Sequence, residues 1–516
     1  MDQIFAPTTT LIERLLIPLF HESVPLYTTT STPMPPRDPL EIPEMMDQVA
    51  SRLEKGDLAR GVRVSKGWRD MLLPHLWRDV QARFSRFPEG SIHSCRGPDR
   101  DIIYSHRHLI ENLYLIGGLN GLDQCHYPNL QKLRLELPFF KCQGDCTTMD
   151  FTKTAPLLAH LKMGHMDIGS AFWETLSTHP HIRHLYLREI KTVATQAFWT
   201  TCTKLTSLGI VGVTFEGNVP FFGTFDQLCQ LTIRNPKKGM EVEDQLDLVL
   251  RCPKLESLSW QMTRGLMLVK HPIQMNHWPH LCQLYIGGYL QDTNLVSILE
   301  GTKSDHGSIV DPRQSSCPLE AHSSKDLRVL FGGLEKVDLS MCYSSSSSTV
   351  LRILCHCPRL KVLNARSVLA KDIAQGGPWA CQQLRELKLY FRVREKEQDL
   401  QPFVFERLST LTQLEVLIME YPCGGDDYQS LLTDICRDAL LFRLDCGMGH
   451  LASLQQLTKL HFLDNPSYIP HLDVDEAVWM VDNWKKLKTI RGRLNEDDVV
   501  NARIKRILEP HGICLS

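Results

Sequence analysis

The sequence predicts an α/β fold: a solenoid of stacked strand-and-helix units, with a curved parallel sheet on the concave side, helices on the convex side and three short helices in front. Leucine occupies 75 of the 516 positions. An apolar pattern recurs about every 20 to 30 residues, and proline precedes several copies at a constant offset. A period of this length is typical of a repeat array and not of a succession of separate domains.

The repeated pattern is L-x-x-L-x-L, and it extends over residues 109–494. Its last two apolar positions alternate with polar ones, as on a strand with one buried face. A single unit cannot bury this apolar edge, whereas stacked neighbours can, as in leucine-rich repeats. The copies are Ile110/Leu113/Leu115, Leu130/Leu133/Leu135, Leu158/Leu161/Met163, Ile182/Leu185/Leu187, Leu205/Leu208/Ile210, Leu228/Leu231/Ile233, Leu255/Leu258/Trp260, Leu281/Leu284/Ile286, Leu334/Val337/Leu339, Leu360/Leu363/Ala365, Leu384/Leu387/Leu389, Leu414/Leu417/Met419, Leu457/Leu460/Phe462 and Leu487/Ile490/Gly492.

Prolines in phase with the pattern support the same prediction without relying on leucine. Several of them follow a segment with helical apolar spacing, and proline disfavours helical backbone before it. Each unit is therefore predicted as a helix, a proline and a strand. The six prolines, each two residues before the first apolar position of a copy, are Pro128, Pro156, Pro180, Pro253, Pro279 and Pro358.

The segments outside the regular repeats have other compositions. Residues 1–37 combine an apolar helix candidate with a Thr- and Pro-rich linker, and residues 81–108 are predicted as a connector. The Ser- and Gly-rich residues 301–325 are predicted as a disordered insertion, and the serine run 344–348 as a flexible turn. Residues 495–516 predict a C-terminal capping helix that begins with acidic residues.

Residues 38–80 predict three short helices. The first carries apolar residues at helical spacing, Gly56-Asp57 precedes the second, and Ser65 caps a third that ends at Pro74. So short a segment buries little apolar surface by itself. Its tryptophans and aliphatic residues therefore suggest a face that a partner completes.

This segment resembles an F-box, in which an opening Leu-Pro, a leucine, an Asp-Leu step, a Val-x-x-x-Trp step and a closing Leu-Trp follow in order. The matching residues here are Ile42-Pro43, Leu53, Asp57-Leu58, Val64-Ser65-Lys66-Gly67-Trp68 and Leu76-Trp77. The resemblance implies binding to the Skp-type adaptor and cullin scaffold of an SCF ubiquitin ligase, with the repeats holding a target protein. The adaptor-binding residues that it implies are Pro43, Met45, Leu53, Leu58, Val64, Trp68, Leu76 and Trp77.

The residue between the two strand positions of each repeat is expected to point to the concave face. Tyrosine and basic residues are frequent there and at the flanking outward positions, and these types dominate protein-interface hot spots. A solvated strand row without a partner contains the same types. The candidate substrate-binding residues, which predict a mildly basic N-terminal half, are Tyr114, Arg134, Tyr186, Arg188, Arg234, Tyr285, Lys388 and Tyr390.

The sequence contains no pattern that indicates an enzyme. Phosphate-binding glycine loops, H-E-x-x-H and G-x-S-x-G are absent. The cysteine pairs Cys142/Cys146 and Cys355/Cys357 lack the second pair that a structural zinc site requires. We expect no catalytic residue, no metal and no cofactor.

Charge and cysteine usage limit the partners and the compartment. Lys and Arg number 57 against 59 Asp and Glu, so no overall field attracts nucleic acid or an anionic membrane. The 17 cysteines are scattered, and no signal peptide or spanning apolar run is recognisable. We therefore expect a cytoplasmic or nuclear protein whose partners are proteins.

The two functions that the sequence leaves open belong to different classes. The first is a substrate-recognition subunit of an SCF-type ubiquitin ligase. The alternative is a leucine-rich-repeat interaction scaffold unrelated to ubiquitination, in which the N-terminal helices only cap the repeats.

Overall fold

The computed structural model describes residues 42–83, 100–116, 125–136, 151–193, 196–216, 223–261, 278–288, 332–343, 345–419, 439–462 and 470–516. They form two compact units, the first ending at His160 and the second starting at Leu161. The segments expected at 1–37 and 301–325 lie outside the described residues.

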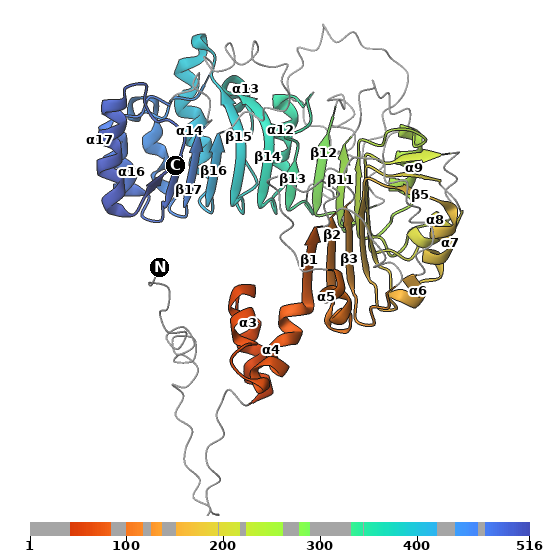
Figure 1. Ribbon diagram of the computed structural model, residues 1–516. Helices are drawn as coiled ribbons and strands as arrows, with labels where there is room; N and C mark the ends of the chain where they lie inside the picture. Colours follow the sequence, from red (N-terminus) through yellow and green to blue (C-terminus); the bar gives the residue numbers. More distant parts are fainter. Residues whose placement is uncertain are drawn as a thin grey trace, which may run out of the picture. The chain divides into compact units, whose positions relative to one another are not determined.

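The first unit begins with the three helices that the sequence predicts. They are α2 (Pro43–Ala50), α3 (Lys55–Gly61) and α4 (Lys66–Arg78) (Figure 1). Their apolar faces meet in a small core of Met46, Ala50, Leu58 and Leu72.

The starts of α3 and α4 are set by local chemistry. The Oγ of Ser65 accepts a hydrogen bond from the backbone N–H of Trp68 at 3.1 Å, so α4 is capped as predicted. The Gly56-Asp57 pair, in contrast, lies inside the first turn of α3, which already begins at Lys55. Asp57 suits this place because the helix dipole favours a negative charge near the N-terminus.

The C-terminus of α4 differs from the prediction. The sequence predicts an end at Pro74, but the helix continues through it to Arg78. An interior proline removes a backbone hydrogen bond at a cost of about 3 kcal/mol. Packing of the next turn offsets this cost, because Leu76 packs against the helical core and the Trp77 ring stacks on His106 with centroids 4.2 Å apart.

The first unit continues with three parallel strands in the order β1, β2, β3. The sequence places the connector 81–108 before the first repeat, but a strand already starts at Asp79, and Val80 pairs in register with Leu113. Only Val80 and Ala82 alternate here, which is too short a pattern to predict a strand. The elements are β1 (Asp79–Arg83), α5 (Arg100–Ser105), η3 (Arg107–Leu109), β2 (Asn112–Ile116), β3 (Lys132–Glu136) and α6 (Phe151–Thr154).

The second unit is built on a long parallel sheet. From β6 to β19, each strand of this sheet pairs in parallel with the next. Apart from β19, these strands coincide with the predicted copies of the pattern, and the first apolar residue of each copy is buried. The strands are β4 (His160–Gly164), β6 (His184–Arg188), β8 (Ser207–Val211), β10 (Gln230–Arg234), β11 (Ser257–Gln261), β12 (Gln283–Gly287), β13 (Lys336–Asp338), β14 (Val362–Leu369), β15 (Glu386–Arg392), β16 (Val416–Met419), β17 (Lys459–Phe462), β18 (Thr489–Arg491) and β19 (Cys514–Leu515).

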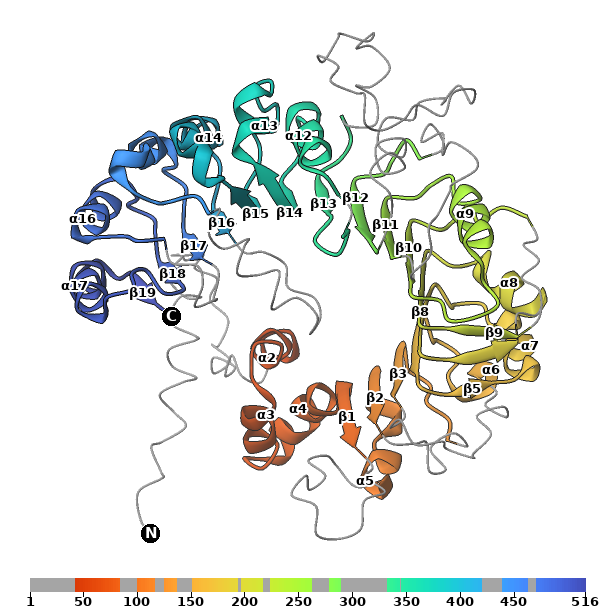
Figure 2. The ribbon, with the colours of Figure 1, turned by 90° about the horizontal axis from the view of Figure 1, so that it is seen from above.

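Helices cover the outer side of this sheet, as Figure 2 shows within the second unit. Neighbouring strands lie about 4.8 Å apart, whereas packed helices need about 8 to 10 Å, so the stack bends toward the strands. This confirms the predicted α/β solenoid of leucine-rich repeats. The helical segments are α7 (Ser170–Thr178), α8 (Gln196–Cys202), α9 (Val242–Leu250), α12 (Ser347–His356), α13 (Ala370–Gln375), η7 (Glu395–Leu400), α14 (Gln401–Ser409), η9 (Leu444–Cys446), η10 (Met448–Ser453), α16 (Val474–Asn483), α17 (Asp498–Leu508) and η11 (Glu509–His511).

A second, small parallel sheet follows the main strands at the start of this unit, and the sequence does not predict it. It contains β5 (Asp167–Ile168), β7 (Lys191–Val193) and β9 (Thr214–Glu216). The chain enters it through a residue with positive φ directly after each main strand, and the backbone N–H of that residue donates to the next repeat. These turn residues are His165, Glu189 and Gly212. Asn235, which also has positive φ, follows β10 and leads to an isolated bridge between Lys238 and Thr214.

A bulge between β14 and β15 breaks the strand alternation. The register passes from Asn364 opposite Lys388 to Ser367 opposite Tyr390, so β14 has one residue more than β15. The sequence predicts an outward Tyr390, but beyond the bulge its side chain is only 1 % exposed. Tyr390 is therefore a core residue.

Two further segments differ from the prediction. The sequence predicts a flexible turn at 344–348, but Ser347 and Ser348 begin helix α12, because the Oγ of Ser346 accepts the backbone N–H of Thr349 at 3.2 Å. Ser344 lies outside the described residues. The C-terminal segment 495–516 contains the predicted capping helix, but the chain then adds strand β19, which pairs with β18.

Candidate protein-binding surfaces

The residues implied as adaptor contacts differ in how much surface they offer. Pro43 and Val64 are exposed, and Val64 is 66 % exposed. Leu58 is 4 % exposed and lies in the helical core, so its side chain holds the helices together. The others are half-buried: Met45, Leu53, Trp68, Leu76 and Trp77.

The two tryptophans of the helical segment are partly covered by their own chain. Trp68 packs against the helical core. Trp77 stacks on His106, and α4 passes directly into β1. An ion pair between Arg78 and Glu111, 3.0 Å long, adds to this connection. Trp77 therefore ties the helices to the first strands of the same unit.

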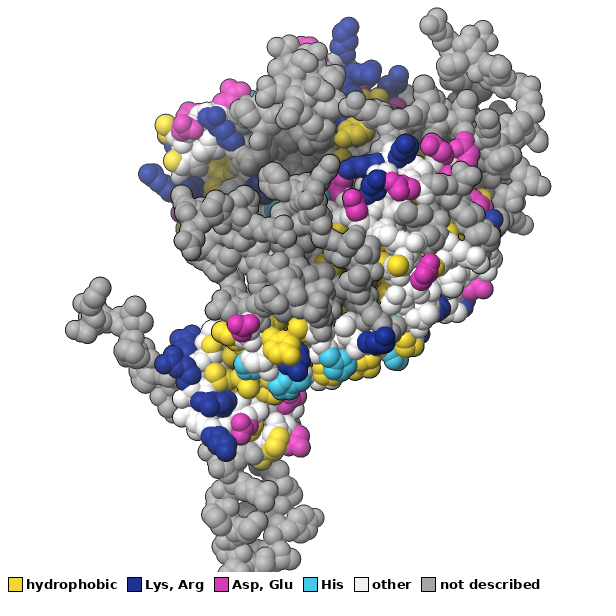
Figure 3. All heavy atoms as spheres, turned by 45° about the vertical axis from the view of Figure 1, so that its right-hand side comes forward, with side chains coloured by type: hydrophobic (Ala, Val, Ile, Leu, Met, Phe, Trp, Pro, Cys, Tyr) yellow, Lys and Arg dark blue, Asp and Glu magenta, His cyan; other side chains and the backbone are white. Residues whose placement is uncertain are grey.

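Apolar side chains remain exposed on the helical segment, where Figure 3 shows them among lysine and arginine side chains. Ile42 is 38 % exposed and lies directly before α2, and Val64 lies directly before the cap of α4. A large exposed aliphatic side chain on so small a helical unit suits a protein contact.

On the main sheet, the predicted concave row is confirmed as a row of register partners. In the first unit Tyr114 lies opposite Arg134. In the second unit the row continues through consecutive strands as Tyr186, Gly209, Thr232, Ser259, Tyr285, Asp338, Asn364, Lys388 and Ile418. The middle positions of the repeats therefore form one continuous line on each unit.

Arg234, Ser259 and Tyr285 form a compact group on three neighbouring strands. The guanidinium of Arg234 lies over the Tyr285 ring, 4.3 Å from its centroid, and its Nε donates to Ser259 Oγ at 3.0 Å. Burial raises the pKa of the Tyr285 hydroxyl above its ordinary value, because the buried site disfavours the charged phenolate. The stacking holds the guanidinium flat on the face, with no carboxylate partner among the described residues.

A similar group forms on β4, β6 and β8. The Nζ of Lys162 lies 4.6 Å from the centroid of the Tyr186 ring. That ring extends across Gly209, where a Cβ atom would collide with it. Glycine at this position is therefore required by the close approach of Tyr186.

Arg188 is exposed at the C-terminal end of β6. The neighbouring carboxylate of Glu189 pairs with Lys237 instead. Arg188 and Arg234 both lie opposite Val211, so they occupy the same level two strands apart. This separation corresponds to about 10 Å.

In the first unit, Tyr114 and Arg134 form a different arrangement. Arg134 lies over the Tyr114 ring at 4.2 Å, but its guanidinium also pairs with Glu136 at 2.5 Å. Tyr114 donates its hydroxyl proton to the same carboxylate at 2.8 Å. The charge of Arg134 is therefore largely neutralised within the chain.

The C-terminal part of the concave row is more mixed in charge. Asp338 accepts hydrogen bonds from Ser340 and from the Nδ2 of Asn364, the latter at 3.1 Å. Lys388 is half-buried on β15, and Tyr390 belongs to the core. Of the candidate residues in the second unit, Arg234 and Tyr285 are in contact. Arg188 and Tyr186 lie on β6, two strands away from Arg234.

Sequence reasoning missed three residues of this region that the contacts single out: Lys162, Gly209 and Ser259. Each lies in the predicted row, but a single lysine, glycine or serine at an outward strand position does not by itself indicate a binding site. The signal that could have identified them is the pairing across repeats, because a cation in one repeat and a tyrosine in a neighbouring one lie within reach.

The most deeply buried cysteines of the described residues are poor nucleophiles, because burial disfavours the reactive thiolate. No described cysteine forms a disulfide, and burial raises the pKa of Cys252 and of Cys381 to about 12. Among the described residues, no three His, Cys, Asp or Glu side chains gather as metal ligands would. Cys142 and Cys146 lie outside the described residues.

Comparisons with known proteins concern the repeats. No family model matches the sequence, and no curated protein matches it. An internalin from Listeria monocytogenes is similar in structure at 14% identity and a TM-score of 0.36, with 89% of this chain and 94% of that chain covered. A leucine-rich-repeat protein from Leptospira interrogans has 12% identity and a TM-score of 0.31, with coverages of 81% and 98%.

A third similar structure is the leucine-rich-repeat ectodomain of a plant membrane receptor kinase from Arabidopsis thaliana, in complex with Casparian strip integrity factor 2. It has 12% identity and a TM-score of 0.31, and the chain spans 42% of its length. None of these likenesses assigns a function to this chain. Within the described residues, no helix has both the length and the apolarity needed to cross a bilayer.

Proposed function

We propose that this protein is a substrate receptor of an SCF-type ubiquitin ligase. The helical segment 42–78 would bind a Skp-type adaptor, and the concave face of the repeats would bind the target protein. The receptor performs no chemistry itself, because it raises the local concentration of target lysines near a charged ubiquitin carrier.

The exposure of Val64 is the observation that supports this proposal most directly. Val64 opens the Val-x-x-x-Trp step of the F-box-like pattern, and its side chain is 66 % exposed. Within the same segment Leu58 and Leu72 are buried, so the helices have a core without Val64. An aliphatic side chain that the fold does not use is available to a partner.

A pull-down with purified adaptor tests the proposal. We expect Val64→Asp to reduce adaptor capture to about a tenth, because a charge would be desolvated at the centre of a protein contact. The fold should persist, since substitutions at exposed positions usually change stability by less than about 0.5 kcal/mol. Substitution of Leu58 would be a poorer test because it would disturb the helical core.

Val499 provides a matched control. It is 60 % exposed on α17, outside the helical segment, so Val499→Asp introduces the same charge on a similar surface without touching the proposed contact. Equal capture by wild type and both variants would contradict the assignment of the contact. No capture of the adaptor by the wild-type chain would contradict the receptor function and favour the scaffold alternative.

A further inference from the structure

The strands that begin the second unit carry an unbalanced charge. The strands β4, β6, β8, β10, β11 and β12 contain no Asp or Glu, whereas they carry Lys162, Arg188 and Arg234. The whole chain has a net charge of −2, so this basic face is a local feature. Among the main-sheet strands of the second unit, acidic residues appear only from β13 onward, at Asp338.

Two of these cations lack an acidic partner among the described residues. Arg234 has a tyrosine ring and a serine hydroxyl as its neighbours, and Arg188 is exposed beside a glutamate that Lys237 already neutralises. A guanidinium with free N–H groups in a fixed plane suits a carboxylate, which it binds through two parallel hydrogen bonds.

A row of small side chains crosses the strands two residues before the level of Arg188 and Arg234. Gly209, Thr232 and Ser259 succeed one another in register, and tyrosines stand at both ends of this row, Tyr186 on one side and Tyr285 on the other. Because the Tyr186 ring already lies across Gly209, the small side chains that could receive an extended backbone are Thr232 and Ser259, and the rings supply apolar contact area beside them.

From this arrangement we propose that the face bounded by Tyr186 and Tyr285 binds an extended acidic segment of a protein partner, with its carboxylates on Arg188 and Arg234. The arginines lie about 10 Å apart, and an extended chain spaces side chains on one side by about 7 Å per two residues. Acidic residues two to four positions apart would therefore reach both guanidinium groups. This inference rests on the proposed function in one respect, namely that the bound partner is a target of the ubiquitin ligase.

Fluorescence polarisation with a labelled peptide of alternating Gly and Glu tests the inference, and the same peptide with Gln is the matched probe. We expect the Glu peptide to bind and the Gln peptide not to bind. Arg188→Ala and Arg234→Ala should each weaken binding about tenfold. Raising the salt from about 0.05 M to about 0.5 M should weaken it further, since screening shortens the range of exposed charges.

The matched control removes two positive charges elsewhere. Arg503 and Arg506 are exposed on α17, and the double variant Arg503→Ala with Arg506→Ala lowers the net charge as much as the double variant Arg188→Ala with Arg234→Ala does. Unchanged peptide binding in this control supports a specific face. Equal weakening by both double variants, or no measurable binding of the Glu peptide, would overturn the inference.

Two further measurements separate the remaining outcomes. A single-stranded oligouridylate that bound more tightly than the Glu peptide, with the same arginine dependence, would overturn the inference in favour of nucleic acid. Adaptor capture by the Arg188→Ala and Arg234→Ala variants reports on the proposed function separately, because those residues lie outside the helical segment. Loss of peptide binding with full adaptor capture would support both.

Discussion

At the scale of single residues, burial decides how the thiols respond to pH. Cys252 is fully buried and its pKa rises from 9.0 to about 12, chiefly through desolvation of the thiolate. The folded chain therefore holds this proton more tightly than the unfolded chain does. The stabilisation is complete below pH 9 and is lost as the pH rises toward 12.

Cys252→Ala should make unfolding less sensitive to alkaline pH. Between about pH 8 and about pH 10.5 the wild type should lose about 2 kcal/mol more unfolding free energy than the variant, at about 1.4 kcal/mol per pH unit above about 9. Urea unfolding at both pH values measures this difference. An identical pH dependence in the two proteins would show that the Cys252 thiol does not contribute.

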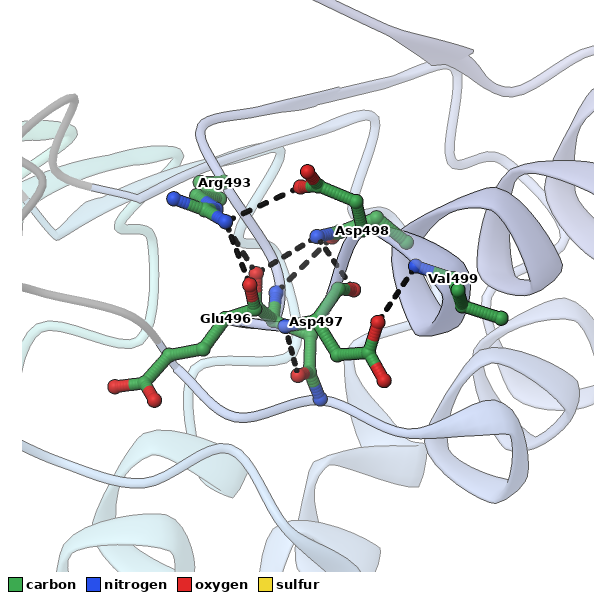
Figure 4. A network of polar contacts seen from close by, with 7 residues as sticks. Arg493, Glu496, Asp497, Asp498 and Val499 are labelled. Carbon is green, nitrogen blue, oxygen red and sulfur yellow. Dashed lines mark hydrogen bonds and ion pairs between the residues drawn. The ribbon is translucent and has the colours of Figure 1, made fainter.

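At the scale of elements, the last helix shows how short-range polar contacts set a boundary. The Oδ1 of Asp497 accepts the backbone N–H of Val499 at 2.7 Å and caps α17 (Figure 4). Arg493 donates to the carbonyl of Glu496 at 2.6 Å and pairs with Asp498 at 3.1 Å. These contacts fix the turn before the helix, so its start depends on Asp497 in particular.

We expect Asp497→Ala to lower the unfolding free energy by about 1 kcal/mol, because an N-terminal backbone N–H loses its partner. Thermal unfolding followed by circular dichroism measures the loss. Asp482→Ala, a change within α16, serves as the control and should leave the midpoint unchanged or slightly higher, since alanine favours helix. Equal midpoints for wild type and Asp497→Ala would contradict the capping role.

At the scale of the whole molecule, the repeats of the second unit depend on their neighbours. Leu258 on β11 is 2 % exposed and lies in register between Leu231 on β10 and Leu284 on β12. In a stacked array each repeat gains stability mainly through such neighbouring interfaces. A defect in one repeat should therefore weaken the adjacent ones first.

Leu258→Ala should cost about 2 to 5 kcal/mol, because it leaves a cavity between three strands. Hydrogen exchange should speed up on β10, β11 and β12 and change less on β18. Leu157→Ala, at a leucine that is 43 % exposed, should change stability by less than about 0.5 kcal/mol. Uniform acceleration over all strands would contradict neighbour-limited coupling.

The sequence by itself determined the solenoid, because the strand period of two and the in-phase prolines are local signals that each repeat carries independently. It also determined the three front helices and the cap at Ser65. Strand β1 was missed because only Val80 and Ala82 alternate in it, and β19 was missed because it is two residues long.

Only the tertiary structure shows which of the residues predicted to point outward contact one another and which of them are buried. Along β15 the alternation of buried and outward residues ends, because Leu389, Tyr390 and Phe391 are all buried. The side chain of Leu58 lies in the helical core. Arg234 meets Tyr285 only because three successive repeats stack with that register. Such contacts join residues far apart in the chain, and their geometry follows from the stacking of whole repeats and not from any local pattern.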